Sequence, residues 1–189
     1  TQVRGEQLLK QVRTILALTG SSKVNLIGHS HGGPTSRYVL GVSPASVASV
    51  TSVGSPHKGS PVADLALQFY AAGGQSTSTL INPLGNGLAS LISLLSGGTT
   101  GYTQDLKASL TSLSTRDSAR FNAQFPAGMP TATCGEGAYS AANGARLYSW
   151  GGTSVITNVI DPSDALFAVT SLAFTSKEAN DGLVGRCSN

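Results

Sequence analysis

The residues best suited to chemistry are Gly28-His29-Ser30-His31-Gly32, which form the pattern G-x-S-x-G. They follow the apolar run 24–27 and precede a stretch that can start a helix. A serine on a sharp turn between a strand and a helix has a strained backbone, and glycines two positions away on either side let the two elements pass closely. The pattern therefore predicts that Ser30 is a nucleophile. The alternative is a glycine-rich turn that happens to contain a serine.

A nucleophilic serine needs partners, and the sequence offers candidates for two of them. The helix after Ser30 would point its positive dipole end and its unpaired N–H groups at a developing oxyanion, so we expect the backbone N–H of His31 to donate there. A histidine must take the serine proton, and a carboxylate must orient that histidine. Asp181, in the glycine-flanked turn 179–184, is the best candidate for this carboxylate.

The histidine itself is harder to assign, because all three histidines precede the candidate acid. His29 and His31 belong to the turn and cannot reach Ser30 as a base while the turn is kept. His57 follows the next expected strand, where a histidine is more typical of a structural hydrogen-bonding residue. We therefore expect the histidine of the triad to lie beyond Asn189.

The segment 161–164 places two carboxylates, Asp161 and Asp164, within four residues. Calcium binds several oxygen ligands, so this loop could form part of a calcium site but not all of one. Asp161 could equally be the N-cap of a following helix, and the two roles do not exclude each other.

The composition is that of one globular domain spanning 1–189, with 40% hydrophobic residues and only 11% charged residues, against an average near 25%. The net charge of +3 is small and scattered, which argues against a nucleic-acid partner. So uncharged a surface suits a secreted protein or one that works beside lipid. No apolar run reaches the 18 or more residues that a membrane span needs.

The two cysteines, Cys134 and Cys187, are far apart in the sequence and have no C-x-x-C motif or histidine cluster beside them. This spacing is more typical of a disulfide than of a zinc site or a redox motif. The alternative is two buried free thiols. An oxidised pair would place the protein outside the cytoplasm.

Hydrophobic periodicity predicts alternating helices and strands in the first third of the chain. Helices are expected over 5–19 and 33–41, with strands over 24–27 and 47–53, the first of these buried on both faces. This order implies a parallel sheet with right-handed crossovers and ligands at the carboxyl ends of the strands. Further on, we expect helices over 62–71 and 104–124, a strand over 146–151 and only weak alternation over 155–160 and 166–174.

The segment between Asp64 and Asp105 has no charged residue and carries an apolar helical stripe over 84–95. Leaving its five large side chains in water would cost about 10 kcal/mol. An ordinary core helix is one explanation. The other is an amphipathic lid over about 76–97 that shields the serine in water and lies on a lipid surface when open. The glycine-rich stretches on both sides favour the lid.

Six segments together make the chain closely similar to a known family, the secreted, calcium-dependent triacylglycerol lipases of Pseudomonas and Burkholderia, which fold with a dedicated chaperone. These segments are 3–9, 23–34, 55–60, 134–137, 161–164 and 180–184. The resemblance covers nearly all of the chain and implies an α/β-hydrolase fold with a mostly parallel sheet flanked by helices and a lid. For single residues it implies the nucleophile Ser30, the triad acid Asp181, the oxyanion donor His31, the calcium ligand Asp161 and a disulfide between Cys134 and Cys187.

The expected activity is hydrolysis of long-chain acylglycerol esters at lipid interfaces. Members of this family also have an N-terminal strand with a second oxyanion donor, and a C-terminal segment with the triad histidine and another calcium aspartate. We therefore expect this chain to be an internal part of a lipase, truncated at both ends, with little or no turnover alone. The alternatives are a non-catalytic module that binds lipid interfaces and a lidless cutinase-like esterase or acyltransferase.

Overall fold

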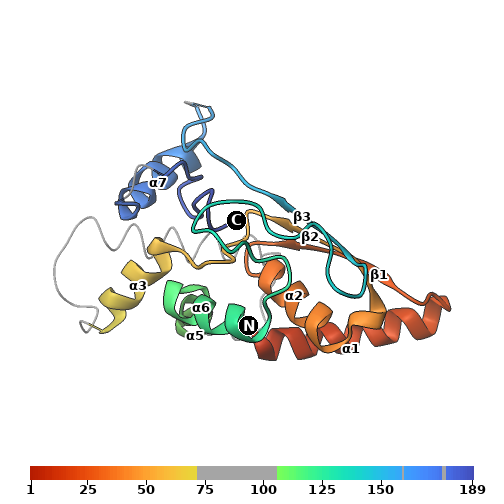
Figure 1. Cartoon of the computed structure of the whole chain (residues 1–189). Helices are drawn as coiled ribbons and strands as arrows, with labels where there is room; N and C mark the ends of the chain where they lie inside the picture. The colour runs from red at the N-terminus through yellow and green to blue at the C-terminus, as the bar shows by residue number, and fades with distance from the viewer. Residues whose placement is uncertain (72–105, 159, 176–177) are drawn as a thin grey trace.

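The computed structural model describes residues 1–71, 106–158, 160–175 and 178–189. Its centre is a parallel sheet with the strand order β1-β2-β3 (Figure 1), formed by β1 (Val24–His29), β2 (Val47–Val53) and β3 (Arg146–Trp150). All three strands run in the same direction, so their carboxyl ends meet at one edge of the sheet. The expected parallel sheet is confirmed.

The helices follow the expected order along the chain. They are α1 (Gln2–Thr19), α2 (Gly32–Val42), α3 (Pro61–Ala71), α5 (Leu106–Leu113), α6 (Thr115–Gln124) and α7 (Pro162–Thr170), with short 3-10 helices at Pro44–Ser46 and Ser171–Ala173. In Figure 1, α1 and α2 lie along one face of the sheet, and α7 lies beyond the carboxyl ends of the strands. The predicted lid over 76–97 falls outside the described residues.

The core lies between the sheet and the α1–α2 layer. Leu26 of β1 and Val50 of β2 face Val39 of α2, and Leu9 and Val12 of α1 close the same cluster. This apolar contact anchors α2 against β1 and β2. It thereby holds the turn between β1 and α2, which contains Ser30.

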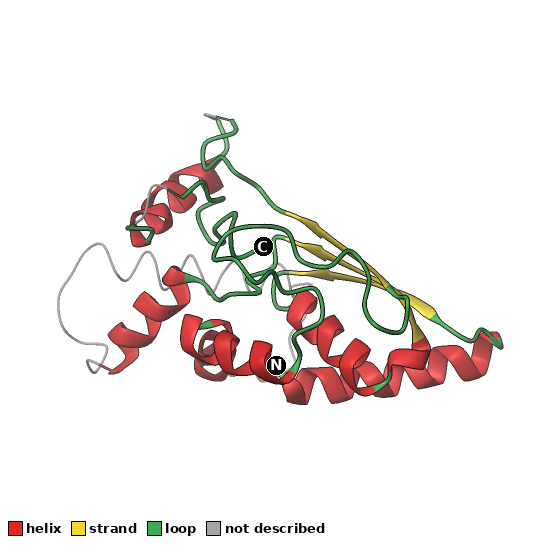
Figure 2. Ribbon diagram, viewed as in Figure 1, coloured by secondary structure: helices red, strands yellow, loops and turns green. Residues whose placement is uncertain are grey.

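The other face of the sheet is open to solvent over the described strands. Ile27 and Tyr148 lie in register with Thr51, and Ile27, Tyr148 and Trp150 are 78%, 48% and 67% exposed. The prediction that 24–27 is buried on both faces is therefore wrong for these residues. The helices that pack on the described sheet lie on its other face (Figure 2), so alternate side chains of each strand point to solvent.

One expectation for the second half of the chain needs correction. The helix expected over 104–124 is divided at Ser114, whose hydroxyl accepts a hydrogen bond from the N–H of Asp117 at 3.2 Å and caps α6. The weakly alternating stretch 166–174 begins within a helix, which was one of the alternatives expected after Asp161. Asp161 caps a helix there, and Pro162 occupies its first turn, where the missing N–H costs nothing.

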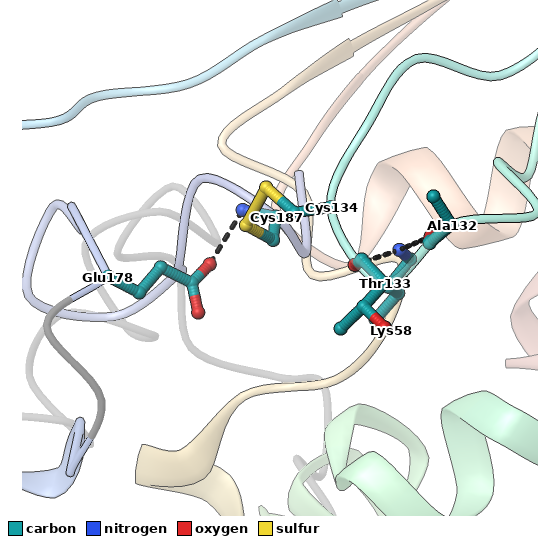
Figure 3. Close-up of a disulfide and its surroundings, with 6 residues drawn as sticks. All are labelled: Lys58, Ala132, Thr133, Cys134, Glu178 and Cys187. Atoms are coloured by element: carbon teal, nitrogen blue, oxygen red, sulfur yellow. Dashed lines mark hydrogen bonds between the residues drawn. A yellow bond between two sulfur atoms is a disulfide. The ribbon is translucent and has the colours of Figure 1, made fainter.

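Cys134 and Cys187 form a disulfide, which confirms the predicted pairing (Figure 3). Beside it, Nζ of Lys58 donates to the carbonyls of Ala132 at 3.1 Å and Thr133 at 2.6 Å. On the other side, Glu178 accepts from the N–H of Cys187 at 2.6 Å. These contacts tie the loop before Cys134 to the last residues of the chain.

Among the described residues, the helices lack the length or hydropathy that crossing a membrane requires.

Candidate active site

Ser30 lies in the sharp turn that joins β1 to α2, as the motif predicts. Its φ is 52°, and among the described residues other than glycine it alone has a positive φ. Its N–H donates to the carbonyl of Val53 at 2.9 Å, and its carbonyl accepts from the N–H of Gly33 at 3.1 Å. The turn therefore holds Ser30 in a strained conformation by hydrogen bonds to the end of β2 and the start of α2.

The glycines around this turn do not all have the role that the motif predicts. A Cβ on Gly28 would lie 2.3 Å from the carbonyl carbon and oxygen of Gly32, so only glycine fits at position 28. A Cβ on Gly32 would meet nothing within 4 Å. The second close approach is made instead by Gly33, where a Cβ would lie 2.3 Å from Oγ of Ser55. The steric requirement thus falls on Gly28 and Gly33, and for Gly32 the prediction is wrong.

His31 is the N-cap of α2, at the helix end whose N–H groups have no partner within the helix. Its backbone N–H is therefore placed next to Ser30, where the helix dipole is positive. The imidazole is buried, and its Nε2 lies 3.0 Å from Oγ1 of Thr1. Burial, with smaller contributions from the N-terminal ammonium and Arg4, lowers the pKa of His31 to about 3. The imidazole is thus neutral at ordinary pH.

Asp181 sits in a tight turn that fixes its carboxylate. Its Oδ1 accepts from the N–H groups of Leu183 at 2.9 Å and Val184 at 2.7 Å, and its own N–H donates to the carbonyl of Val184 at 3.2 Å. Gly182 has a φ of 93°, the left-handed conformation that this turn needs. These bonds occupy Oδ1, and they hold the side chain in one orientation.

The structure brings Asp181 to the edge of the sheet where Ser30 lies. A Cβ on Gly54, the residue after β2, would lie 3.8 Å from Oδ2 of Asp181 and 3.8 Å from Nε2 of His29. Ser30 bonds to the neighbouring residue, Val53. The carboxyl end of β2 therefore has the serine turn on one side and Asp181 close by, as a parallel sheet with a ligand site at its strand ends would have.

None of the three histidines hydrogen-bonds to Oγ of Ser30 among the described contacts. His57 is 9% exposed, and its Nδ1 lies 3.3 Å from NH1 of Arg37. Burial, with a smaller effect of the Arg37 charge, lowers the pKa of His57 to about 3. Its backbone carbonyl accepts from Asn122 at 2.8 Å. His57 is therefore a structural hydrogen-bonding residue, as its position in the sequence suggests.

Asp161 serves as the N-cap of α7, one of the two roles expected for it. Its Oδ1 accepts from the N–H of Ser163 at 2.9 Å and from the Ser163 hydroxyl at 2.7 Å, and these bonds lower the pKa of its carboxyl group. The neighbouring Asp164 accepts from the N–H groups of Thr157 and Asn158, both at 2.7 Å. Within the described part of the chain, no group of three His, Cys, Asp or Glu side chains gathers to hold a metal.

Two glycines that sequence reasoning missed lie against Asp181. A Cβ on Gly152 would lie 2.9 Å from Cβ of Asp181 and would crowd it, whereas a Cβ on Gly54 would be in ordinary contact with Oδ2 at 3.8 Å. Gly54 directly follows β2, and Gly152 lies two residues after the end of β3. A glycine just past each strand end is therefore the signal that could have identified the place where the carboxylate packs.

The chain is similar to known proteins over most of its length. The alpha/beta hydrolase fold family matches residues 3–158. The chain is 54% identical over 185 residues to a triacylglycerol lipase of Vibrio cholerae and 38% identical over 216 residues to one of Burkholderia plantarii, with 98% of this chain aligned in both cases. A triacylglycerol lipase of Pseudomonas fragi is 37% identical over 196 residues.

This chain is shorter than these relatives. It spans 58%, 59% and 66% of the Vibrio, Burkholderia and Pseudomonas proteins. The crystal structure of a Bacillus licheniformis lipase in mature form superposes with a TM-score of 0.62 over 98% of this chain and 60% of that one, at 21% identity. That likeness concerns the fold. With the family match over most of its length and a serine turn between a parallel strand and a helix, the chain belongs to the α/β hydrolase family.

Proposed function

We propose that this chain forms the nucleophile-bearing core of a triacylglycerol lipase, which hydrolyses long-chain acylglycerol esters at lipid interfaces. The observation that carries the proposal is the positive φ of Ser30 between β1 and α2. Strain of this kind persists only where the surroundings enforce it, and it is typical of functional turns. The relatives named triacylglycerol lipase, 37–54% identical over nearly the whole chain, support the choice of substrate.

In the proposed reaction, Oγ of Ser30 attacks the ester carbonyl and the alcohol leaves, so that an acyl-serine forms and water later releases the acid. The N–H of His31 donates to the oxyanion of each tetrahedral intermediate, supported by the α2 dipole. Asp181 orients the histidine that takes the serine proton. The side chains of His31 and His57 make other contacts, and His29 belongs to the serine turn itself. We therefore propose that the base is a different histidine from these three.

The alternatives from the sequence are less well supported. A module that only binds lipid interfaces has no need of a serine in the left-handed conformation at the end of a parallel strand. A cutinase-like esterase differs from a lipase by its lack of a lid, and the segment 76–97 lies outside the described residues. The relatives named triacylglycerol lipase favour a lipase over an esterase of the cutinase kind.

Three further features belong to this proposal. We propose an extracellular protein, supported by the disulfide between Cys134 and Cys187. We propose that Asp161 supplies one oxygen ligand to a calcium ion. The other ligands would come from residues other than Asp161 and Asp164. Folding with a dedicated chaperone is supported by the resemblance of the six sequence segments alone.

Chemical rescue tests the role of Ser30. If the base is missing from this chain, hydrolysis of p-nitrophenyl butyrate should be slow. After subtraction of the hydrolysis that imidazole causes without protein, the rate should rise with added imidazole, and Ser30→Ala should abolish this protein-dependent rise. Ser21→Ala, in the exposed turn after α1, is the matched control and should behave as the parent. Mass spectrometry should find the butyryl ester on Ser30.

Two other outcomes are informative. Equal rates for the parent and Ser30→Ala at every imidazole concentration, with no butyryl ester on Ser30, would contradict the proposal. Rapid turnover that depends on Ser30 without imidazole would show that a group within this chain acts as the base.

A further inference from the structure

A cavity of about 540 Å³ lies under β3, on the face of the sheet that also carries α2. It exists because the close contacts of α2 are with β1 and β2. The inner face of β3 is instead covered by the loop 126–139, and Leu147 and Ser149 of β3 line the space between them. Ser30, His31 and Asp181 are not among the lining residues, so this cavity is separate from the candidate active site.

The wall of the cavity carries more positive than negative charge. Three cationic side chains, Arg37, Lys58 and Arg186, line it, whereas Glu136 is the one carboxylate side chain in the lining. The Lys58 ammonium is held by the carbonyls of Ala132 and Thr133 (Figure 3), which are uncharged. The cavity therefore has an excess of positive charge that would attract an anion.

Arg37 is the most unusual of these cations, because it is only 5% exposed. Its guanidinium donates to the carbonyls of Ala127 at 3.2 Å and Phe125, and to Oδ1 of Asn122 at 2.9 Å. All these acceptors are uncharged, and Arg37 forms no ion pair among the described residues. Burial lowers the pKa of Arg37 to about 10, so it remains charged at neutral pH. A buried cation without a carboxylate partner is uncommon.

His57 adds a hydrogen-bond donor beside Arg37. A guanidinium only donates, so Nδ1 of His57 must be the acceptor of the contact at 3.3 Å, and the ring proton is then on Nε2. No hydrogen bond within the described residues uses Nε2, and no fully buried side-chain nitrogen or oxygen there lacks a partner. Nε2 is therefore at the small part of His57 that solvent reaches. His57 is also one of the residues that line the cavity.

Part of the wall is apolar. Val50 and Leu147 of the sheet and Met129 and Pro130 of the loop line the same space. A ligand that suits both kinds of wall has one anionic group and an alkyl chain. The volume of about 540 Å³ lies within the usual range of about 300–1,000 Å³ for small-molecule sites.

We propose that this cavity binds a medium-chain carboxylic acid as its carboxylate, with Arg37 and Nε2–H of His57 at the carboxylate and Val50, Met129 and Leu147 along the alkyl chain. The site rests on charge and shape. Only the relation of this ligand to the longer acids that the proposed ester hydrolysis releases rests on the proposed function. The protein would then hold a shorter homologue of its proposed product at a second place, away from Ser30.

Isothermal titration calorimetry of the 189-residue chain with octanoate, below its micelle concentration, tests the site. We expect saturable binding with one equivalent of octanoate. Acetate has the charge without the chain, and 1-octanol has the chain without the charge, so both should bind at least tenfold more weakly. Failure of octanoate to saturate, or binding of 1-octanol as strong as that of octanoate, would overturn the proposal.

Variants locate the binding in the cavity. Arg186→Glu reverses an exposed charge in the wall and should weaken octanoate binding about fivefold to tenfold. Arg116→Glu makes the same change at an exposed residue outside the cavity and should leave the affinity unchanged. Met129→Trp should fill the apolar part and abolish binding, whereas Met129→Leu should preserve it. Circular dichroism must show each variant folded, and equal affinities for all four would contradict the site.

The test of octanoate binding is independent of the chemical-rescue test of Ser30. The titrations use binding and not turnover, and Ser30→Ala should bind octanoate as the parent does. If Ser30 fails the chemical-rescue test but octanoate still binds with the expected pattern of variants, the lipase proposal is wrong and the site remains. If Ser30 passes and octanoate does not bind, only the present inference is wrong.

Discussion

Gly33 and Ser55 approach so closely that a Cβ on Gly33 would lie 2.3 Å from Oγ and 2.5 Å from Cβ of Ser55. Ser55 is fully buried, and its hydroxyl lies 3.3 Å from the carbonyls of Gly28 and Val53. It therefore cannot move aside without disturbing the ends of β1 and β2. This contact sets the distance between the first turn of α2 and the sheet, and with it the position of the serine turn.

Gly33→Ala should therefore destabilise the protein, by about 1–3 kcal/mol as for other overpacked cores. Gly32→Ala is the matched control, because a Cβ at position 32 meets nothing within 4 Å and Gly32 has no positive φ. It should be neutral or slightly stabilising, since alanine restricts the unfolded chain. Urea unfolding followed by circular dichroism measures both. Equal losses of unfolding free energy would contradict the steric assignment.

The buried histidines predict how stability depends on pH. In the folded protein the pKa of His31 and that of His57 are about 3, against 6.5 for an ordinary histidine. Below pH 6.5 the unfolded chain therefore binds protons that the folded chain does not. The unfolding free energy is highest above pH 6.5 and should fall as the pH decreases toward 3, by up to about 1.4 kcal/mol per pH unit for each histidine.

Urea unfolding at intervals between pH 7 and pH 4 measures this slope. In His57→Gln one of the two protons is removed, so the slope should decrease by up to about half even where the variant is less stable at neutral pH. A slope unchanged by this substitution would show that His57 does not contribute to the loss of stability in acid.

Asp181 has two roles that substitution can separate. Asp181→Ala removes the acceptor of the Leu183 and Val184 N–H groups and should cost about 1–3 kcal/mol. Asp181→Asn keeps an acceptor oxygen there and should cost less, while it removes the negative charge. If the charge orients a histidine, the Asn variant of the active enzyme should lose kcat while it stays folded. An Asn variant with full activity would contradict that role.

The disulfide should matter to stability more than its place at the surface suggests. Cys134 and Cys187 are separated by 53 residues, and closure of a loop of this length restricts the unfolded chain by about 4 kcal/mol in the loop-entropy description. The double variant Cys134→Ala with Cys187→Ala should lose stability on this scale. Thermal unfolding of the parent with and without dithiothreitol is the measurement, and the double variant, unaffected by dithiothreitol, is its control.

The parts of the fold that the sequence predicted well depend on local pattern. The strand over 47–53 has the predicted bounds, and the turn at Ser30 follows from the motif and the apolar run before it. The disulfide followed from the number and spacing of the cysteines. In each case the information lies within a few neighbouring residues or in the count of one residue type.

The features that the sequence did not predict depend on contacts between distant segments. Four apolar residues at 24–27 cannot reveal whether both faces of a strand are covered, because a helix from elsewhere decides that. The packing of Asp181 against Gly54 joins residues more than a hundred positions apart. The pair formed by Arg37 and His57, and the cavity beside it, likewise arise only when α2 meets the loop after β2.

The open face of the sheet carries its own spectroscopic label. Trp150 is the protein's single tryptophan, and it lies on β3 with two thirds of its surface in water. Its indole emission therefore reports on this face with no background from other tryptophans. A detergent, a second copy of the chain or an added helix that binds this face and covers Trp150 will shift its emission maximum to the blue. Binding can therefore be titrated directly by fluorescence.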